Sequence, residues 1–183
     1  MNKRTFLKAL AGLAAVPLTA LGYRSIDIVN STELRQSGAT GLAEEPPLEK
    51  IKLTNAEWKK LLTPQQYQVL RKEGTERPFT SDLNDEKRDG IYACAGCYLP
   101  LFNANAKYDS GTGWPSFFSA IPNHIGTSTD YKLIFPRTEY HCVRCGGHQG
   151  HLFKDGPQPT GLRYCNNGVA LKFHTVDESI SNV

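Results

Sequence analysis

The sequence lacks an apolar run long enough to cross a bilayer. The uncharged run at residues 9–22 has 14 residues, whereas a membrane-spanning helix needs about 20. The sequence also lacks a basic stripe, because Lys3, Arg4 and Lys8 account for all of the formal charge of +3. Nucleic-acid binding is therefore not expected. Membrane contact is expected only through residues 1–22, if that segment is retained.

Residues 1–22 have the features of an export signal. A basic start precedes the apolar run, and small residues stand at Ala20 and Gly22, the two positions that a signal peptidase reads. The run Lys-Arg-Thr-Phe-Leu-Lys at residues 3–8 also resembles a bacterial twin-arginine signal with one Arg replaced by Lys. We therefore expect an exported protein of the bacterial periplasm, either soluble or anchored by its N-terminus.

Three other interpretations of this segment are open. An uncleaved signal would act as a membrane anchor. A short amphipathic surface helix is disfavoured because Pro17 interrupts the run and no polar periodicity is present. A mitochondrial or plastid transit peptide is disfavoured because no serine precedes Ser25.

Composition divides the rest of the chain into three parts. Residues 23–50 contain Ser, Thr, Asn and Pro with little apolar periodicity, which predicts a flexible tether. Residues 51–174 carry the periodic segments and are long enough for one domain with its own core. Residues 175–183 are predicted to be a frayed C-terminal tail.

Two short helices are predicted at the start of the domain. Thr54 and Glu57 have the spacing of a capping box. The apolar residues that follow share one face of this helix: Trp58, Leu61 and Leu62. A second helix begins at Pro64, with Thr63 as its N-cap, and ends at Gly74.

After Gly90 the sequence consists of short strand-like pieces separated by Gly, Pro and Asn clusters. The expected strands are residues 91–94, 131–135, 139–143, 151–153 and 169–173. No strand alternates with a long helix, so a parallel sheet is not expected. The prediction is a mainly β, antiparallel domain with short N-terminal helices.

Only five cysteines are present, and four of them form two C-x-x-C pairs with 44 residues between them. The pairs are Cys94 with Cys97, and Cys142 with Cys145. Two such turns can present four thiolates to one tetrahedral zinc ion, and a site closed by four sulfurs is structural. Gly96 and Gly146 are expected to give these turns the backbone freedom that they need. We predict one structural zinc ion per chain, stapling the two halves of the domain.

Three alternatives compete with the zinc site. Two local disulfides are possible in an exported protein, although C-x-x-C disulfides are usually redox-active. A thioredoxin-like redox site is disfavoured because Tyr98-Leu-Pro follows Cys97, where such a site continues as a helix. A Cys2His2 finger that uses His148 and His151 is disfavoured because the gap after Cys145 is far shorter than the ~12 residues of such fingers.

The fifth cysteine, Cys165, has no partner at a recognisable spacing. A lone thiol in such a setting is a candidate nucleophile, although a lone cysteine is more often a small buried apolar residue. Arg163, two residues away, could lower the pKa of this thiol. His148 and His151 could donate protons near neutral pH, and Trp114 and Phe117 could line an apolar pocket.

Four longer motifs occur in a fixed order along the domain: Thr75-Glu-Arg-Pro-Phe, Ser110-Gly-Thr-Gly-Trp-Pro-Ser-Phe, His148-Gln-Gly-His and Arg163-Tyr-Cys-Asn-Asn. Together they resemble the peptide methionine-R-sulfoxide reductase family, type B, in its zinc-containing form. The resemblance runs from about residue 53 to about residue 173. It implies two antiparallel sheets with short helices on the N-terminal side.

The resemblance also implies roles for single residues. Cys165 corresponds to the nucleophile, which becomes a sulfenic acid. The other implied catalytic residues are His148, His151 and Asn167, and the implied substrate-binding residues are Trp114, Phe117, Arg163 and Asp155. Two positions depart from the family pattern. Gly168 stands where a serine is expected, which would loosen a local hydrogen bond, and Thr112 stands where many relatives carry a resolving cysteine.

The expected function is thiol-dependent reduction of methionine-R-sulfoxide in peptides and proteins, which repairs oxidised proteins. With four cysteines on zinc and Thr112 in place of a resolving cysteine, no second thiol remains in the chain. An external thioredoxin-like protein or a small thiol is therefore the expected reductant, and a monomer is expected. The alternatives are a non-enzymatic zinc-stapled β module that binds a partner protein and a periplasmic thiol oxidoreductase that uses one C-x-x-C pair.

Overall fold

The computed structural model describes residues 48–132 and 135–175. The predictions of an export signal, of most of the tether and of the C-terminal tail beyond Thr175 lie outside the described residues. Every described residue belongs to one compact unit. Within the described ranges, no helix has the length and apolarity that a membrane span requires.

Two short helices open the unit, as predicted. The helix α1 (Asn55–Leu61) has the full capping box between Thr54 and Glu57, and α2 (Pro64–Lys72) has Pro64 at its first position. The end of α2 differs from the prediction, because Glu73 adopts the left-handed conformation one residue before the expected glycine.

The expected apolar face of α1 is only partly correct. Trp58 and Leu62 are buried, whereas Leu61 is 66% exposed. The helix is seven residues long, so Leu61 lies at its C-terminal end and the capping Leu62 takes the inward position.

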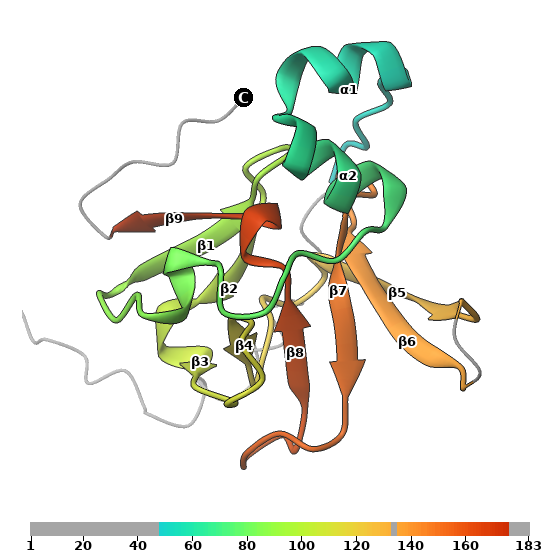
Figure 1. Ribbon diagram of the computed structural model, residues 1–183. Coiled ribbons are helices and arrows are strands. Elements are labelled where there is room, and N and C mark those ends of the chain that lie inside the picture. Colours follow the sequence, from blue (N-terminus) through green and yellow to red (C-terminus); the bar gives the residue numbers. More distant parts are fainter. Residues whose placement is uncertain (1–47, 133–134, 176–183) are drawn as a thin grey trace, which may run out of the picture. The chain divides into compact units, whose positions relative to one another are not determined.

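Nine strands form two antiparallel sheets in the described part of the chain (Figure 1). The first sheet has the order β2 (Pro100–Asn103), β1 (Gly90–Cys94), β9 (Leu171–Thr175). The second has the order β3 (Lys107–Tyr108), β4 (Ser116–Phe117), β8 (Arg163–Asn166), β7 (His148–Phe153), β6 (Arg137–Cys142), β5 (Ile125–Asp130). Three short 3-10 helices, Asp82–Asn84, Ala104–Ala106 and Gly168–Ala170, complete the fold. The predicted mainly β fold is confirmed.

The core is aromatic and joins the two sheets. Phe102 of β2 stacks on Phe117 of β4, with ring centroids 4.1 Å apart and an angle of 9° between the rings. Tyr92 of β1 meets Phe117 edge-on at 5.0 Å, and all three side chains are fully buried. Phe102 also meets Tyr164 of β8 edge-on at 5.7 Å, so the smaller sheet supports the strand that carries Cys165.

Two predicted strands differ from the structure. The strand expected at residues 169–173 begins only at Leu171, after the 3-10 helix Gly168–Ala170. In the strand expected at residues 131–135, the described residues 131, 132 and 135 lie outside any strand, because β5 precedes them and ends at Asp130. Tyr131 and Phe135 are 76% and 78% exposed in the connection that follows. Every residue of β5 pairs with a residue of β6. Although most of its side chains are polar, β5 is therefore a strand because its backbone pairs with a neighbouring strand.

Candidate active site

Cys165 lies in the middle of the larger sheet. It stands opposite His151 of β7 on one side and opposite Ser116 of β4 on the other. The two central strands come unusually close beside it, because a Cβ at Gly150 would overlap with the carbonyl oxygen of Cys165. The glycine between the two histidines therefore allows β7 to pack tightly against the strand that carries the thiol.

A small cavity of about 110 Å³ opens beside Cys165. Its lining residues are Thr75, Trp114, Arg137, Gly150, His151, Phe153, Cys165 and Asn167. Four of the predicted site residues, Cys165, His151, Asn167 and Trp114, therefore meet in one cavity. The rings of Trp114 and Phe153 form an apolar wall, and it stands next to the thiol of Cys165 and the imidazole ring beside it. Such a cavity suits a small sulfur-containing group.

Trp114 and Asn167 are held by the segment that follows α2. The indole Nε1 of Trp114 donates to the carbonyl oxygen of Glu76 at 3.2 Å. The Asn167 side-chain oxygen accepts from the Glu76 backbone N–H at 3.0 Å. The buried Glu76 carboxylate in turn accepts from the backbone N–H groups of Gly168 and Val169. Glu76 thus fixes two walls of the cavity, and Asn167 is anchored before any substrate arrives.

Phe117 is a correction to the predicted site. It is fully buried and stacks in the core. Successive residues of a strand point to opposite faces, and Ser116 is the residue paired with Cys165. Phe117 must therefore face away from the thiol, and Phe153 of β7 supplies the phenylalanine ring in the cavity.

Arg163 and Asp155 form a bidentate ion pair with both distances at 2.8 Å. The guanidinium also lies 4.2 Å from the centre of the Phe153 ring. Neither Arg163 nor Asp155 lines the cavity. Arg163 instead supports the Phe153 ring that forms the cavity wall.

The protonation of Cys165 reflects its partial burial. Desolvation raises the pKa of the thiol above its ordinary value, while the nearby Arg163 charge and hydrogen bonds with Thr112 and Arg163 act in the opposite direction. The predicted effect of Arg163 is therefore present but is outweighed by burial. Thr112, at the position where a resolving cysteine was considered, lies within hydrogen-bonding reach of the thiol.

Each of the two histidines is paired with a carboxylate. The Nε2 atom of His151 lies 2.7 Å from Asp130 Oδ2, and the Nδ1 atom of His148 lies 2.7 Å from Glu139 Oε1. Burial lowers the pKa of His151, and the hydrogen bond to Asp130 opposes this effect. His148 is only 2% exposed and lies behind His151, with their ring centres 5.5 Å apart.

Sequence reasoning missed six residues that build this site. They are Thr75, Glu76, Asp130, Arg137, Glu139 and Phe153. Two of them stand in the first recognised motif, and Arg137-Thr-Glu139 places charged residues at the start of β6, where Glu139 is buried. A charged residue at a buried strand position is a signal that could have found Glu139.

The four paired cysteines form a second, separate cluster in the core. All four sulfurs lie within 4.8 Å of one another, and all four residues are buried. The closest approaches are 3.6 Å between Cys94 and Cys145, and 3.5 Å between Cys97 and Cys142. A disulfide requires about 2.05 Å, and all five cysteines are free thiols. The cluster therefore has the donor set of a tetrahedral metal site.

A comparison with protein-family models matches residues 62–175 to the SelR domain. This match covers more than half of the chain. The chain belongs to the SelR family. The resemblance seen in its motifs is thereby confirmed.

Two relatives match this chain over most of their own length. A peptide methionine sulfoxide reductase MsrB of Pseudomonas putida strain W619 is 52% identical over 131 residues, which is 71% of this chain and 98% of the relative. The MsrB of Methanosarcina barkeri is 49% identical over 129 residues, which is 70% of this chain and 91% of the relative. A crystal structure of the Mis18 'Yippee-like' domain covers half of this chain with a TM-score of 0.39 and 15% identity, which is too distant to carry an argument.

The two C-x-x-C turns of this SelR chain are built alike. The backbone N–H of Tyr98 donates to the Cys94 carbonyl at 2.8 Å, and that of Gly146 donates to the Cys142 carbonyl at 2.9 Å. Both residues directly follow the second cysteine of their pair, and both have positive φ, 59° and 67°. The expectation for Gly146 is confirmed, whereas Tyr98 rather than Gly96 takes the left-handed conformation in the first turn.

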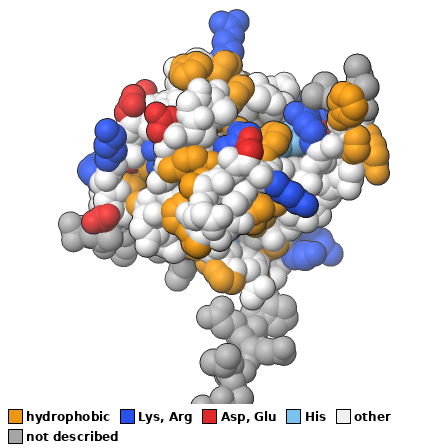
Figure 2. Space-filling model, turned by 90° about the horizontal axis from the view of Figure 1, so that it is seen from below, with side chains coloured by type: hydrophobic (Ala, Val, Ile, Leu, Met, Phe, Trp, Pro, Cys, Tyr) orange, Lys and Arg blue, Asp and Glu red, His pale blue; other side chains and the backbone are white. Residues whose placement is uncertain are grey.

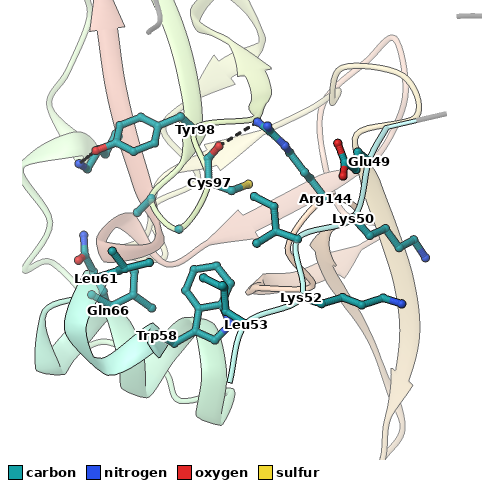
Figure 3. Close-up of a pocket in the computed structure, with 15 residues that line it drawn as sticks. Glu49, Lys50, Lys52, Leu53, Trp58, Leu61, Gln66, Cys97, Tyr98 and Arg144 are labelled. Atoms are coloured by element: carbon teal, nitrogen blue, oxygen red, sulfur yellow. Dashed lines mark hydrogen bonds between the residues drawn. The ribbon is translucent and has the colours of Figure 1, made fainter. Parts of the chain in front are cut away.

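A larger cavity of about 570 Å³ lies beside the cysteine cluster and not beside Cys165. Figure 3 shows Trp58, Leu53 and Leu61 along its apolar side, with Lys50 and Lys52 on the segment that precedes α1. Arg144 donates to the Cys97 carbonyl at 3.3 Å (Figure 3). The partly exposed Leu61 thus lines a cavity wall. None of the residues that line the cavity beside Cys165 lines this one.

Proposed function

We propose that the protein reduces methionine-R-sulfoxide in peptides and proteins to methionine, with Cys165 as the nucleophile. The observation that carries the proposal is the cavity in which a half-buried thiol, His151 and Trp114 meet. Membership of the SelR family and the MsrB relatives at about half identity support the same reaction. The preference for the R epimer comes from the family alone.

The chemistry of the site fits this reaction. The Cys165 thiolate attacks the sulfoxide sulfur, and His151 supplies a proton to the sulfoxide oxygen. Attack forms a bond between the two sulfurs, and the protonated sulfoxide oxygen leaves as water when the substrate sulfur–oxygen bond breaks. Water then attacks the Cys165 sulfur, which breaks the sulfur–sulfur bond, forms the sulfur–oxygen bond to Cys165 and releases one proton. The substrate sulfur gains two electrons, the cysteine sulfur loses two, and one proton is taken up when the thiolate is the starting form. The products are methionine and a Cys165 sulfenic acid.

Exposed aromatic side chains next to the site suit a polypeptide substrate. Phe79 is 74% exposed, and its backbone bonds to Gly113, the neighbour of Trp114. Tyr131 is 76% exposed and directly follows Asp130, the partner of His151. Figure 2 shows one face of the molecule with hydrophobic groups in its middle and at one edge, and Lys and Arg side chains form no continuous strip on it. The two exposed rings beside the site favour an apolar peptide segment as the substrate.

The four-cysteine cluster is proposed to hold one structural zinc ion per chain. A tetrahedral site with Zn–S bonds of about 2.3 Å has sulfurs roughly 3.8 Å apart. The closest sulfur pairs, at 3.5 and 3.6 Å, approach this spacing. Zinc would tie the turn after β1 to the turn after β6 and would supply folding free energy. A closed four-sulfur site leaves no position for substrate.

We propose that an external thiol regenerates Cys165. We also propose that the protein is a monomer. The other four cysteines are buried together in the cluster, and a threonine hydroxyl lies beside the thiol. No second thiol stands near the sulfenic acid, so a thioredoxin-like protein or a small thiol must reduce it directly. Residues 1–22 support the further proposal that this happens after export to the periplasm.

The decisive experiment gives the purified protein the two separated sulfoxide epimers with dithiothreitol. We expect reduction of the R epimer, and Cys165→Ser should abolish it while zinc content and fold persist. Reaction with one equivalent of sulfoxide without reductant, followed by dimedone, should label Cys165 in the mass spectrum. An inactive but folded, zinc-loaded protein would favour the non-enzymatic binding module. A disulfide from Cys165 to a paired cysteine, with loss of zinc, would contradict direct recycling.

A further inference from the structure

The Asp130 carboxylate is held by hydrogen bonds on both of its oxygens, next to a histidine that lines the catalytic cavity. Its Oδ1 accepts from the backbone N–H of Lys132 at 2.8 Å. Its Oδ2 accepts from His151 Nε2 at 2.7 Å and from Arg137 Nη2 at 2.6 Å. The side chain is 8% exposed, and Asp130 does not line the cavity itself. Its link to the cavity runs through the imidazole of His151.

This contact decides which nitrogen of His151 faces the reaction. An ionised carboxylate can only accept hydrogen bonds, so His151 Nε2 must carry a hydrogen. The Lys132 N–H, the His151 ring and the Arg137 guanidinium hold the pKa of Asp130 well below its usual range. The neutral imidazole therefore keeps its hydrogen on Nε2, and Nδ1 is the nitrogen that remains for the substrate.

We infer that Asp130 is a positioning residue of the reductase step: it fixes the tautomer and orientation of His151 so that Nδ1 gives its proton to the sulfoxide oxygen. This inference rests on the proposed function. The protonated imidazole loses one proton to the departing oxygen and becomes neutral, while Nε2–H stays on Asp130. The same negative charge opposes the burial that lowers the His151 pKa, so it favours the imidazolium from which the proton is given and keeps that ring aligned when Cys165 attacks.

Arg137 provides a natural test, because its charge lowers the pKa of His151 whereas Asp130 raises it. The charged or titratable groups that face His151 come from four strands: Asp130 on β5, Arg137 and Glu139 on β6, His148 on β7, and Cys165 with Arg163 on β8. Of these, Asp130 raises the pKa of His151, whereas Arg137 and His148 lower it. A merely structural ion pair between Asp130 and Arg137 would make both substitutions act in the same direction.

The experiment compares full-length wild-type protein, Asp130→Asn, Arg137→Gln and the control Asp89→Asn, which changes an exposed aspartate away from the cavity. The steady-state rate with methionine-R-sulfoxide and dithiothreitol is measured from acid to alkaline pH, together with zinc content and melting temperature. We expect Asp130→Asn to lower kcat about tenfold or more, since a positioned proton donor contributes about 10²–10⁴-fold. Its KM should stay within about twofold of the wild-type value, because Asp130 does not touch substrate.

The pH profile carries the sign test. In a plot of kcat/KM against pH, one of the two inflections reports the pKa of His151. This inflection should move to lower pH in Asp130→Asn, which removes the charge that raises the pKa, and to higher pH in Arg137→Gln, which removes a charge that lowers it. The other inflection should not move. The control should match the wild type. If Asp130→Asn does not fold, the upward shift in Arg137→Gln decides alone.

Three results would overturn the inference. They are an Asp130→Asn variant with a rate within about twofold of the wild type, a His151 inflection that does not move, or a movement in the same direction in both variants. Wild-type protein that reduces no sulfoxide would overturn the proposed function as well, whereas active wild type beside a normal Asp130→Asn would overturn this inference alone.

Discussion

Replacing Gly168 by serine, the residue expected there from the family pattern, should destabilise this protein. A Cβ added to Gly168 would overlap with the Ser81 hydroxyl and would lie 2.5 Å from Ser81 Cβ. Ser81 cannot simply turn away, because its Cβ is fixed to the backbone and its hydroxyl caps the 3-10 helix by accepting from Leu83 N–H at 3.2 Å. The structure thus explains Gly168 by the space that Ser81 occupies, and the backbone N–H of residue 168 keeps its bond to Glu76.

The size of the effect follows from overpacking. Forcing a side chain into filled space costs about 1–3 kcal/mol, which lowers the melting temperature by roughly 4–12 °C at about 4 °C per kcal/mol for a domain of this size. Activity should fall with it, because Gly168 directly follows the anchored Asn167. Ser81→Gly alone should cost only about 0.5 kcal/mol, through loss of the helix cap.

The assay is a double-mutant cycle in thermal or urea unfolding, with sulfoxide reduction measured on the same samples. The double variant Ser81→Gly/Gly168→Ser should recover most of the lost stability and activity, because the overlap is removed. Two findings would refute the reasoning: a Gly168→Ser variant as stable as the wild type, or losses that simply add in the double variant.

Three further predictions concern the thiols and the cavity wall. Any single Cys→Ser change in the four-cysteine cluster should remove the metal and the cooperative unfolding transition, as measured by metal analysis and calorimetry; retained metal would contradict the cluster. Arg163→Gln should move the pH midpoint of Cys165 alkylation upward, because Arg163 opposes the burial that already raises the thiol pKa; an unchanged midpoint in mass spectrometry would exclude this effect. Trp114→Ala should lower kcat/KM about tenfold or more, equivalent to about 1.4 kcal/mol, and equal kinetics would remove Trp114 from the substrate wall.

The sequence alone determined the features that depend on local chemistry. The capping box at Thr54 and the proline at the start of α2 satisfy backbone groups within one helical turn, so neighbouring residues suffice to specify them. The two C-x-x-C turns likewise carry their donor sets within four residues each. The ordered motifs gave the family, and with it Cys165, His151, Asn167 and Trp114, which do meet in one cavity.

Tertiary structure decided what depends on pairing between distant strands. Phe117 turned into the core because Ser116 took the register position opposite Cys165, and register is a long-range property of the sheet. Asp130 is the partner of His151 because the pairing of β5 with β6 places the last residue of β5 next to His151 of β7. The thiol pKa rose despite Arg163 because burial, which sums over the whole fold, outweighed one nearby charge. Local patterns name the reactive groups, but only the packed sheet sets their direction, their partners and their protonation.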